Sequence, residues 1–157
     1  MVNPVRKIFS EVNRAYLAGL IDGDGAIMAF IEKHQEKRFG YRVRVSIKIS
    51  QNKDEVLRWC KRVCGFGCIK YSRTQYEWYS HDQEAIKSCL IGLLPFLRVK
   101  KKQAKIAIRI LNTKVKTKQG LIKLALLADA LSKFNVRSHG RRKNFATMIQ
   151  ENISPND

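Results

Sequence analysis

Residues 16–25, which read YLAGLIDGDG, place an apolar run directly before two aspartates separated by glycine. Ser10 is a favourable N-cap and Glu11 suits a first helical turn, so the sequence predicts a helix that ends near Asp22. Because residues 15–21 are apolar on nearly every side, this helix must be surrounded by protein. A helix C-terminus already carries about half a negative charge, so two carboxylates at that end indicate a bound cation.

The segments that follow have the periods of strands and helices. They predict strands over 26–32 and 41–50, a helix over 53–64, a second hairpin over 67–80 with its turn near 73–75, and a helix over 83–93. The order αββαββα is that of an α+β fold with one antiparallel sheet and helices on one of its faces. The other face of the sheet is then available to a ligand.

Helical spacing continues beyond Pro95, over about 99–113, 119–134 and 145–152. We expect a single domain over 1–157, with a core of about 10–96 and a C-terminal helical cap of about 97–157.

The cysteines do not have the spacing of a zinc site. Cys60, Cys64 and Cys68 follow one another at intervals of four, and Cys89 stands apart. No secretory signal is evident at the N-terminus, so we expect reduced thiols that are buried as small apolar side chains.

The charge balance is extreme. Lys and Arg number 31 and Asp and Glu number 13, which gives a net charge of +18. A chain this basic repels itself unless it meets a polyanion, and nucleic acid is the leading partner. We expect no membrane partner, because no apolar run reaches the roughly 18–20 residues that span a bilayer.

A divalent cation accounts for the acidic helix end. Residues 41–50 alternate strictly, with apolar side chains on one face and Arg42, Arg44 and Lys48 on the other. Mg²⁺ binds proteins through one or two carboxylates together with substrate phosphates, and beside this cationic strand face it indicates phosphodiester hydrolysis. Gly23 and Gly25 would allow the backbone to approach the phosphate and the metal closely.

The segment YLAGLIDGDG resembles the signature of the LAGLIDADG homing endonucleases, with Gly23 at the position of the name-giving alanine. The segment PFLRVKKKQA, residues 95–104, and the element order also resemble that family, so the resemblance covers nearly the whole chain. It is greatest to the small members that carry one motif and act as homodimers. It implies a site-specific endonuclease that makes metal-dependent double-strand breaks in a long, near-palindromic DNA target.

The resemblance also implies roles for individual residues. Asp24 matches the essential metal-binding carboxylate, and Gly23 matches the position whose carbonyl also reaches the metal. Gln51 matches a residue that positions water, and Lys100 matches a lysine beside the scissile phosphate. These assignments make Asp24, Gln51 and Lys100 the expected catalytic residues and Mg²⁺ or Mn²⁺ the expected cofactor.

Other positions are assigned less directly. Asp22 matches an acid with a structural role, and either Lys53 or Glu55 takes the place of a basic residue that small members often carry near the active site. Two copies are expected to pack through the motif helix, in a saddle-shaped homodimer, by contacts of Tyr16, Leu17, Ala18, Gly19 and Ile21.

The sheet is expected to lie in the major groove, which admits a two-stranded ribbon. Arg42 and Arg44 suit guanine, Gln75 suits adenine and Glu77 suits cytosine. The side chains expected to contact DNA from the sheet are Met28, Phe30, Glu32, Arg42, Arg44, Ser46, Lys48, Lys70, Ser72, Arg73, Gln75, Glu77 and Tyr79. Those expected on phosphates are Lys102, Arg137, Ser138, Arg141, Arg142 and Lys143.

Two other functions remain open. Some members of the resembled family help to fold their host intron, so an RNA-binding maturase with intron RNA as a partner is one alternative. A DNA-binding regulator without catalysis is the other, although the intact Asp24, Gln51 and Lys100 argue against it. The family implies an organelle, chloroplast or mitochondrion, as the expected compartment, with bacterial or archaeal cytoplasm as the alternative.

Overall fold

A computed structural model describes residues 10–135 and 145–152. The elements are α1 (Glu11–Asp24), β1 (Gly25–Lys33), β2 (Tyr41–Gln51), α2 (Glu55–Cys64), β3 (Cys68–Ser72), β4 (Gln75–Ser80), α3 (Gln83–Leu93), α4 (Lys101–Asn112), α5 (Lys118–Phe134) and α6 (Phe145–Asn152). This order confirms the predicted αββαββα unit with further helices after it. The basic residues 137–143, predicted to hold phosphates, lie outside the described ranges.

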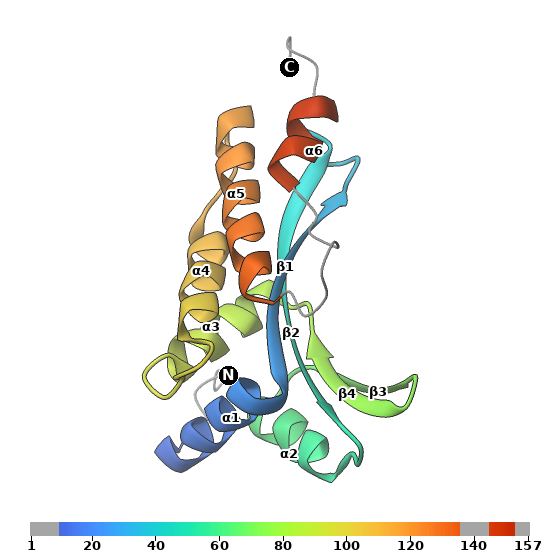
Figure 1. Ribbon diagram of the computed structural model, residues 1–157, viewed down its shortest axis with the longest axis vertical. Helices are drawn as coiled ribbons and strands as arrows, with labels where there is room; N and C mark the ends of the chain where they lie inside the picture. Colours follow the sequence, from blue (N-terminus) through green and yellow to red (C-terminus); the bar gives the residue numbers. More distant parts are fainter. Residues whose placement is uncertain (1–9, 136–144, 153–157) are drawn as a thin grey trace, which may run out of the picture.

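The four strands form one antiparallel sheet in the order β1-β2-β4-β3. Ala29 lies opposite Val45 and Ile49 lies opposite Trp78, so apolar side chains from neighbouring strands share one face. Val45, Ile49 and Trp78 are each 0% exposed. Figure 1 shows α3, α4 and α5 on one side of β1 and β2, and the core lies between these helices and the sheet.

Strand β2 is longer than its neighbour β4, which pairs only with residues 47–51 of β2. Within the described ranges, the first half of β2 therefore has no strand on that side. The side chain of Gln83, the first residue of α3, takes over at this point. Its Oε1 accepts the N–H of Val45 at 2.9 Å and its Nε2 donates to the C=O of Val45 at 2.8 Å. The start of α3 therefore satisfies backbone groups that a strand would otherwise bind.

The cysteines follow the prediction in part. Cys60, Cys64 and Cys89 are buried, but Cys68 is exposed. The expectation of burial is wrong for Cys68 because it begins β3, on the outer face at the edge of the sheet. All four are free thiols.

Candidate functional site

The end of α1 brings two predicted catalytic residues together. Asp24 is the last residue of α1, and Gly25 both closes the helix, with its N–H on the carbonyl of Ile21, and opens β1. Gly25 lies opposite Ile49 in β2, so Gln51 stands two residues further on, level with the helix end. Gln51 Nε2 donates to Asp24 Oδ2 at 2.7 Å. Residues 27 apart in the sequence thus meet because the helix and two strands converge.

Lys100 reaches the same helix end from another part of the chain. Its Nζ donates to the main-chain carbonyl oxygen of Asp22 at 2.6 Å. Lys100 immediately precedes α4, so the ammonium group is presented from the start of that helix. The structure therefore places the three predicted catalytic residues around one end of α1.

Asp22 fixes the turn that carries Lys100. Its two carboxylate oxygens accept the backbone N–H groups of Arg98, at 2.7 Å, and of Lys100, at 2.9 Å. Both contacts join α1 to a segment 76–78 residues away. Asp22 has the structural contacts that its assignment implied, and it determines where Lys100 sits.

We expect Asp22→Ala to lower the free energy of unfolding by about 1–3 kcal/mol, because two backbone donors lose their acceptor. Asp22→Asn, which keeps one acceptor oxygen, should lose less. Urea unfolding of the three proteins measures this order. An Asp22→Ala protein as stable as wild type would show that these bonds contribute nothing net.

The donors at the helix end suit a hard divalent cation. Gly23 and the Asp24 side chain are both exposed, and a Cβ built on Gly23 would have no atom within 4 Å, so the end of α1 is open to solvent at these two residues. The described residues include no cluster of three or more His, Cys, Asp or Glu side chains that could enclose an ion. One carboxylate with a backbone carbonyl fits Mg²⁺, whose remaining ligands are water and phosphate oxygens.

The outer face of the sheet is basic but not free of acid. Glu32 on β1 contacts Arg42 Nε, and its Oε1 lies 3.4 Å from Arg44 Nη1. Glu77 on β4 pairs with Lys48 at 3.2 Å and with Lys70 at 3.4 Å. Strand β2 carries no acidic residue on this face. The neighbouring strands β1 and β4 each supply one carboxylate, which lies between two basic side chains.

The acids are held in their charged form. Burial raises the pKa of Glu32, but hydrogen bonds and charge from Arg42 and then Arg44 outweigh it and leave the pKa lowered. Burial likewise raises the pKa of Glu77, and Lys48 and Lys70 outweigh it. Both groups therefore face any approaching DNA as carboxylates.

Ser46 is a correction among the predicted DNA contacts. It is only 4% exposed, although it shares the outer face with Arg44 and Lys48. Its side chain is short, and it lies opposite the longer Met28 near the middle of the sheet. The prediction of a direct DNA contact by Ser46 is therefore wrong in this conformation.

Most of the other residues predicted to contact DNA lie on the outer face of the sheet, as the alternation of side chains along a strand predicts. Lys70 lies opposite Glu77 and Ser72 lies opposite Gln75, on the same outer face. Arg73 forms the hairpin turn with φ 59°, and Lys102 is exposed in the first turn of α4. Met28, Phe30 and Tyr79 are partly exposed on their strands.

Two residues join this surface that sequence reasoning did not select. Asn52 accepts a hydrogen bond from Gln75 Nε2 at 3.2 Å. His81 packs edge-on against the rings of Phe30, at 5.9 Å, and Tyr79, at 5.6 Å. Burial, and then the charge of Arg44, lower the pKa of His81. No periodicity marked either residue, since both lie just beyond a strand end.

The exposed side of α1 differs from the predicted dimer contacts. Leu17 and Ala18 are 0% exposed and Ile21 is 1% exposed, so they pack into their own chain and the prediction that they meet a partner is wrong. An apolar helix must direct some of its side chains to its own core. Tyr16, 54% exposed, and Gly19 remain accessible, together with Val12 at 77%.

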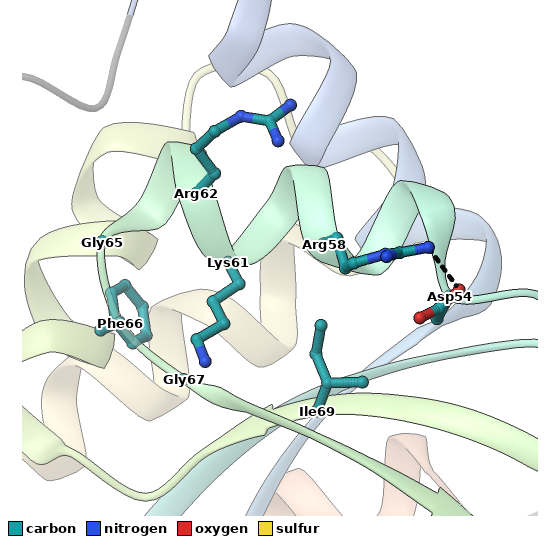
Figure 2. Close-up of a pocket in the computed structure, with 8 residues that line it drawn as sticks. All are labelled: Asp54, Arg58, Lys61, Arg62, Gly65, Phe66, Gly67 and Ile69. Carbon is teal, nitrogen blue, oxygen red and sulfur yellow. Dashed lines mark hydrogen bonds and ion pairs between the residues drawn. The ribbon is translucent and has the colours of Figure 1, made fainter.

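A groove of about 680 Å³ lies between α2 and the start of β3, with Phe66 and Ile69 among its lining residues (Figure 2). Arg58 is paired with Asp54 there at 3.1 Å. Lys61 lies in the last turn of α2, where the helix dipole favours a cation. The groove shares no residue with the Asp24 site. Its cations have roles in α2 itself, since Arg58 pairs with Asp54 and Lys61 and Arg62 lie at the negative end of the helix dipole.

Comparison with known proteins bears on the site. A family model described as LAGLIDADG endonuclease matches residues 17–104, which run from α1 into α4. DNA endonuclease I-CvuI of Chlorella vulgaris is 31% identical over 148 residues, covering 91% of this chain and 88% of the relative. DNA endonuclease I-CreI of Chlamydomonas reinhardtii is 30% identical over 101 residues, covering 62% of this chain and 61% of the relative.

The fold is also shared. The crystal structure of homing endonuclease I-CvuI in complex with its target in the presence of Ca matches with a TM-score of 0.80 and 28% identity. The match covers 89% of this chain and 91% of that one. Another structure of I-CvuI, bound to the I-CreI target in the presence of Mg with its DNA not cleaved, also has a TM-score of 0.80.

Proposed function

Because this chain belongs to the LAGLIDADG endonuclease family, we propose that it is a site-specific homing endonuclease. It hydrolyses both strands of a long, near-palindromic duplex DNA in a reaction that requires a divalent metal ion. The observation that carries the proposal is the hydrogen bond from Gln51 to Asp24 at the exposed end of the motif helix, with Lys100 beside it.

Three side chains divide the work at this site. Asp24, with the carbonyl of Gly23, would hold Mg²⁺ or Mn²⁺, which when bound would polarise the phosphoryl group and lower the pKa of water. The amide of Gln51 fixes the orientation of the Asp24 carboxylate and offers its oxygen to the attacking water. Lys100 supplies positive charge where the phosphate gains negative charge.

Two strands require two such sites, and each chain supplies one. We propose that two copies pack through the exposed side of α1, formed by Val12, Tyr16 and Gly19. A two-fold axis there would bring both Asp24 residues to the centre of the target. The same symmetry calls for a target whose halves are related by a palindrome.

The α1 surface gives a test of the dimer. Gly19→Arg places a large charge where a Cβ meets no atom of its own chain, so the protein should fold while its partner is excluded. Light scattering after gel filtration should change from two protomers to one, and cleavage of both strands should be lost. Leu126→Arg, at an exposed apolar position on α5, is the matched control. A dimer that persists in Gly19→Arg would place the interface elsewhere.

Metal-dependent cleavage is tested with a supercoiled plasmid pool that carries randomised near-palindromic inserts. Linear product should form with Mg²⁺ or Mn²⁺ and should not form with EDTA, and Ca²⁺ should support binding. An A-form RNA duplex should compete poorly, since its major groove is too deep and narrow for a sheet. Strong competition by RNA without cleavage in any metal would favour an intron-binding role instead.

A further inference from the structure

Glu77 lies at the centre of a charged cluster on the outer sheet face, formed by Lys48, Lys70 and Glu77 and here named the Glu77 cluster. Its members come from β2, β3 and β4. Lys70 is directly opposite Glu77 in the strand register, while Lys48 reaches it diagonally, since Ser50 is the residue opposite Glu77. The Nζ atom of Lys70 also lies 4.8 Å from the centre of the Tyr79 ring. Three strands thus converge on one carboxylate.

The order of exposure within the cluster is informative. The Glu77 side chain is 16% exposed, while those of Lys48 and Lys70 are 38% and 50% exposed. Each carboxylate oxygen is engaged by a different lysine, Oε1 by Lys48 and Oε2 by Lys70. A ligand that approaches this face meets the two ammonium groups first, and Glu77 lies beneath them.

A carboxylate in this place has a cost for a protein that binds DNA. It reduces the charge of the cluster from two positive units to one, on the face that would meet a polyanion. An untethered lysine has a long flexible stem and can reach the phosphates of any sequence. A lysine held at 3.2 Å from a carboxylate on the sheet is instead kept close to the sheet, and in a duplex docked on this face it would lie toward the base edges.

We infer that Glu77 is a specificity-determining residue that acts through Lys48 and Lys70, an inference that rests on the proposed function of site-specific DNA cleavage. Glu77 keeps these lysines away from phosphates and positions them over base edges. The affinity for duplexes of any sequence is therefore lower, and the preference for the target sequence is higher. This differs from the sequence-based expectation that Glu77 itself accepts a hydrogen bond from cytosine. A direct reader would have its own oxygens exposed, whereas both oxygens here are taken by lysines.

The two roles give opposite results for Glu77→Gln, an isosteric change. Binding is measured by fluorescence anisotropy in Ca²⁺ over a range of salt, with two probes. One probe is a random-sequence duplex, and the other is the duplex that the wild-type protein selects from a randomised pool. Glu84→Gln is the matched control, because it removes one negative charge from an exposed position on α3.

If Glu77 restrains the lysines, Glu77→Gln binds the random duplex several-fold tighter, and its preference for the selected duplex falls. The slope of log affinity against log salt on the random duplex steepens by about 1–2, as one or two lysines gain phosphates. Glu84→Gln changes neither the preference nor the slope. In a Lys48→Gln/Lys70→Gln background, Glu77→Gln should no longer steepen the slope.

Several outcomes overturn the inference. Weaker binding of the selected duplex alone, with random binding and slope unchanged, makes Glu77 a direct base reader. Equal effects of Glu77→Gln and Glu84→Gln leave only a general charge effect. An effect of Glu77→Gln that persists without the lysines removes them from the mechanism. A wild-type protein that selects no duplex from the pool contradicts the proposed function itself, so the two failures are distinguishable.

Discussion

Asp24→Asn should lower the single-turnover cleavage rate in Mg²⁺ by at least about a thousandfold. The change keeps the size of the side chain and an oxygen that can accept the N–H of Gln51. It removes the negative charge that we propose holds the divalent ion at the helix end. Binding of the selected duplex in Ca²⁺ should stay within about threefold of wild type, because we expect the lysines and arginines of the sheet to supply most of the affinity.

The comparison separates chemistry from folding and binding. Glu84→Gln serves as the control for the loss of one carboxylate away from the site. Cleavage by Asp24→Asn at a rate within tenfold of wild type would exclude Asp24 as the metal ligand. Its carboxylate would then serve only to bind Gln51.

The second large effect concerns the junction of α1 and β1. Gly25→Ala should lower the free energy of unfolding by about 3 kcal/mol or more. A Cβ at Gly25 would lie 2.6 Å from Ile21 Cα and 2.8 Å from Ile21 O. Both are backbone atoms of the helix that Gly25 closes, so no side-chain rotation can relieve the contact. The junction would have to open, and Asp24 would move with it.

Gly23→Ala is the matched variant, two residues away and with no atom within 4 Å of the added Cβ. Within a helix it should be neutral or stabilising by about 0.5–1 kcal/mol, since alanine favours helices over glycine. Urea unfolding followed by circular dichroism measures both. A Gly25→Ala protein as stable as Gly23→Ala would mean that the close approach at Ile21 is readily relieved.

Local patterns predicted the elements of the fold well. Strict alternation over 41–50 predicts the dry and basic faces of β2, and the helical spacing over 53–64 predicts the helix observed over Glu55–Cys64. Such signals lie within a few residues of one another, so the sequence carries them directly. The candidate site around Asp24 could also be predicted from the sequence, because an acid at the C-terminal end of an apolar helix conflicts with the helix dipole.

Features that depend on contacts between segments distant in the sequence could not be predicted from local patterns. The acid-bridged contacts of Glu32 and Glu77 require the register between strands, which alternation alone does not determine. The side of α1 that faces its own core depends on which helices and strands pack on it. The dimer contacts predicted for Leu17, Ala18 and Ile21 and the DNA contact predicted for Ser46 therefore fall on buried residues.

The symmetry of the cuts tests the central claim most directly. Wild-type protein is incubated with the randomised plasmid pool and Mg²⁺, and both broken ends of every linear molecule are sequenced. We expect one class of near-palindromic sequence, with the cuts in the two strands related by its two-fold axis and absent when EDTA replaces Mg²⁺. Breaks scattered over unrelated sequences, or single-strand cuts without a symmetric partner, would contradict a homodimer that carries one Asp24 site for each strand.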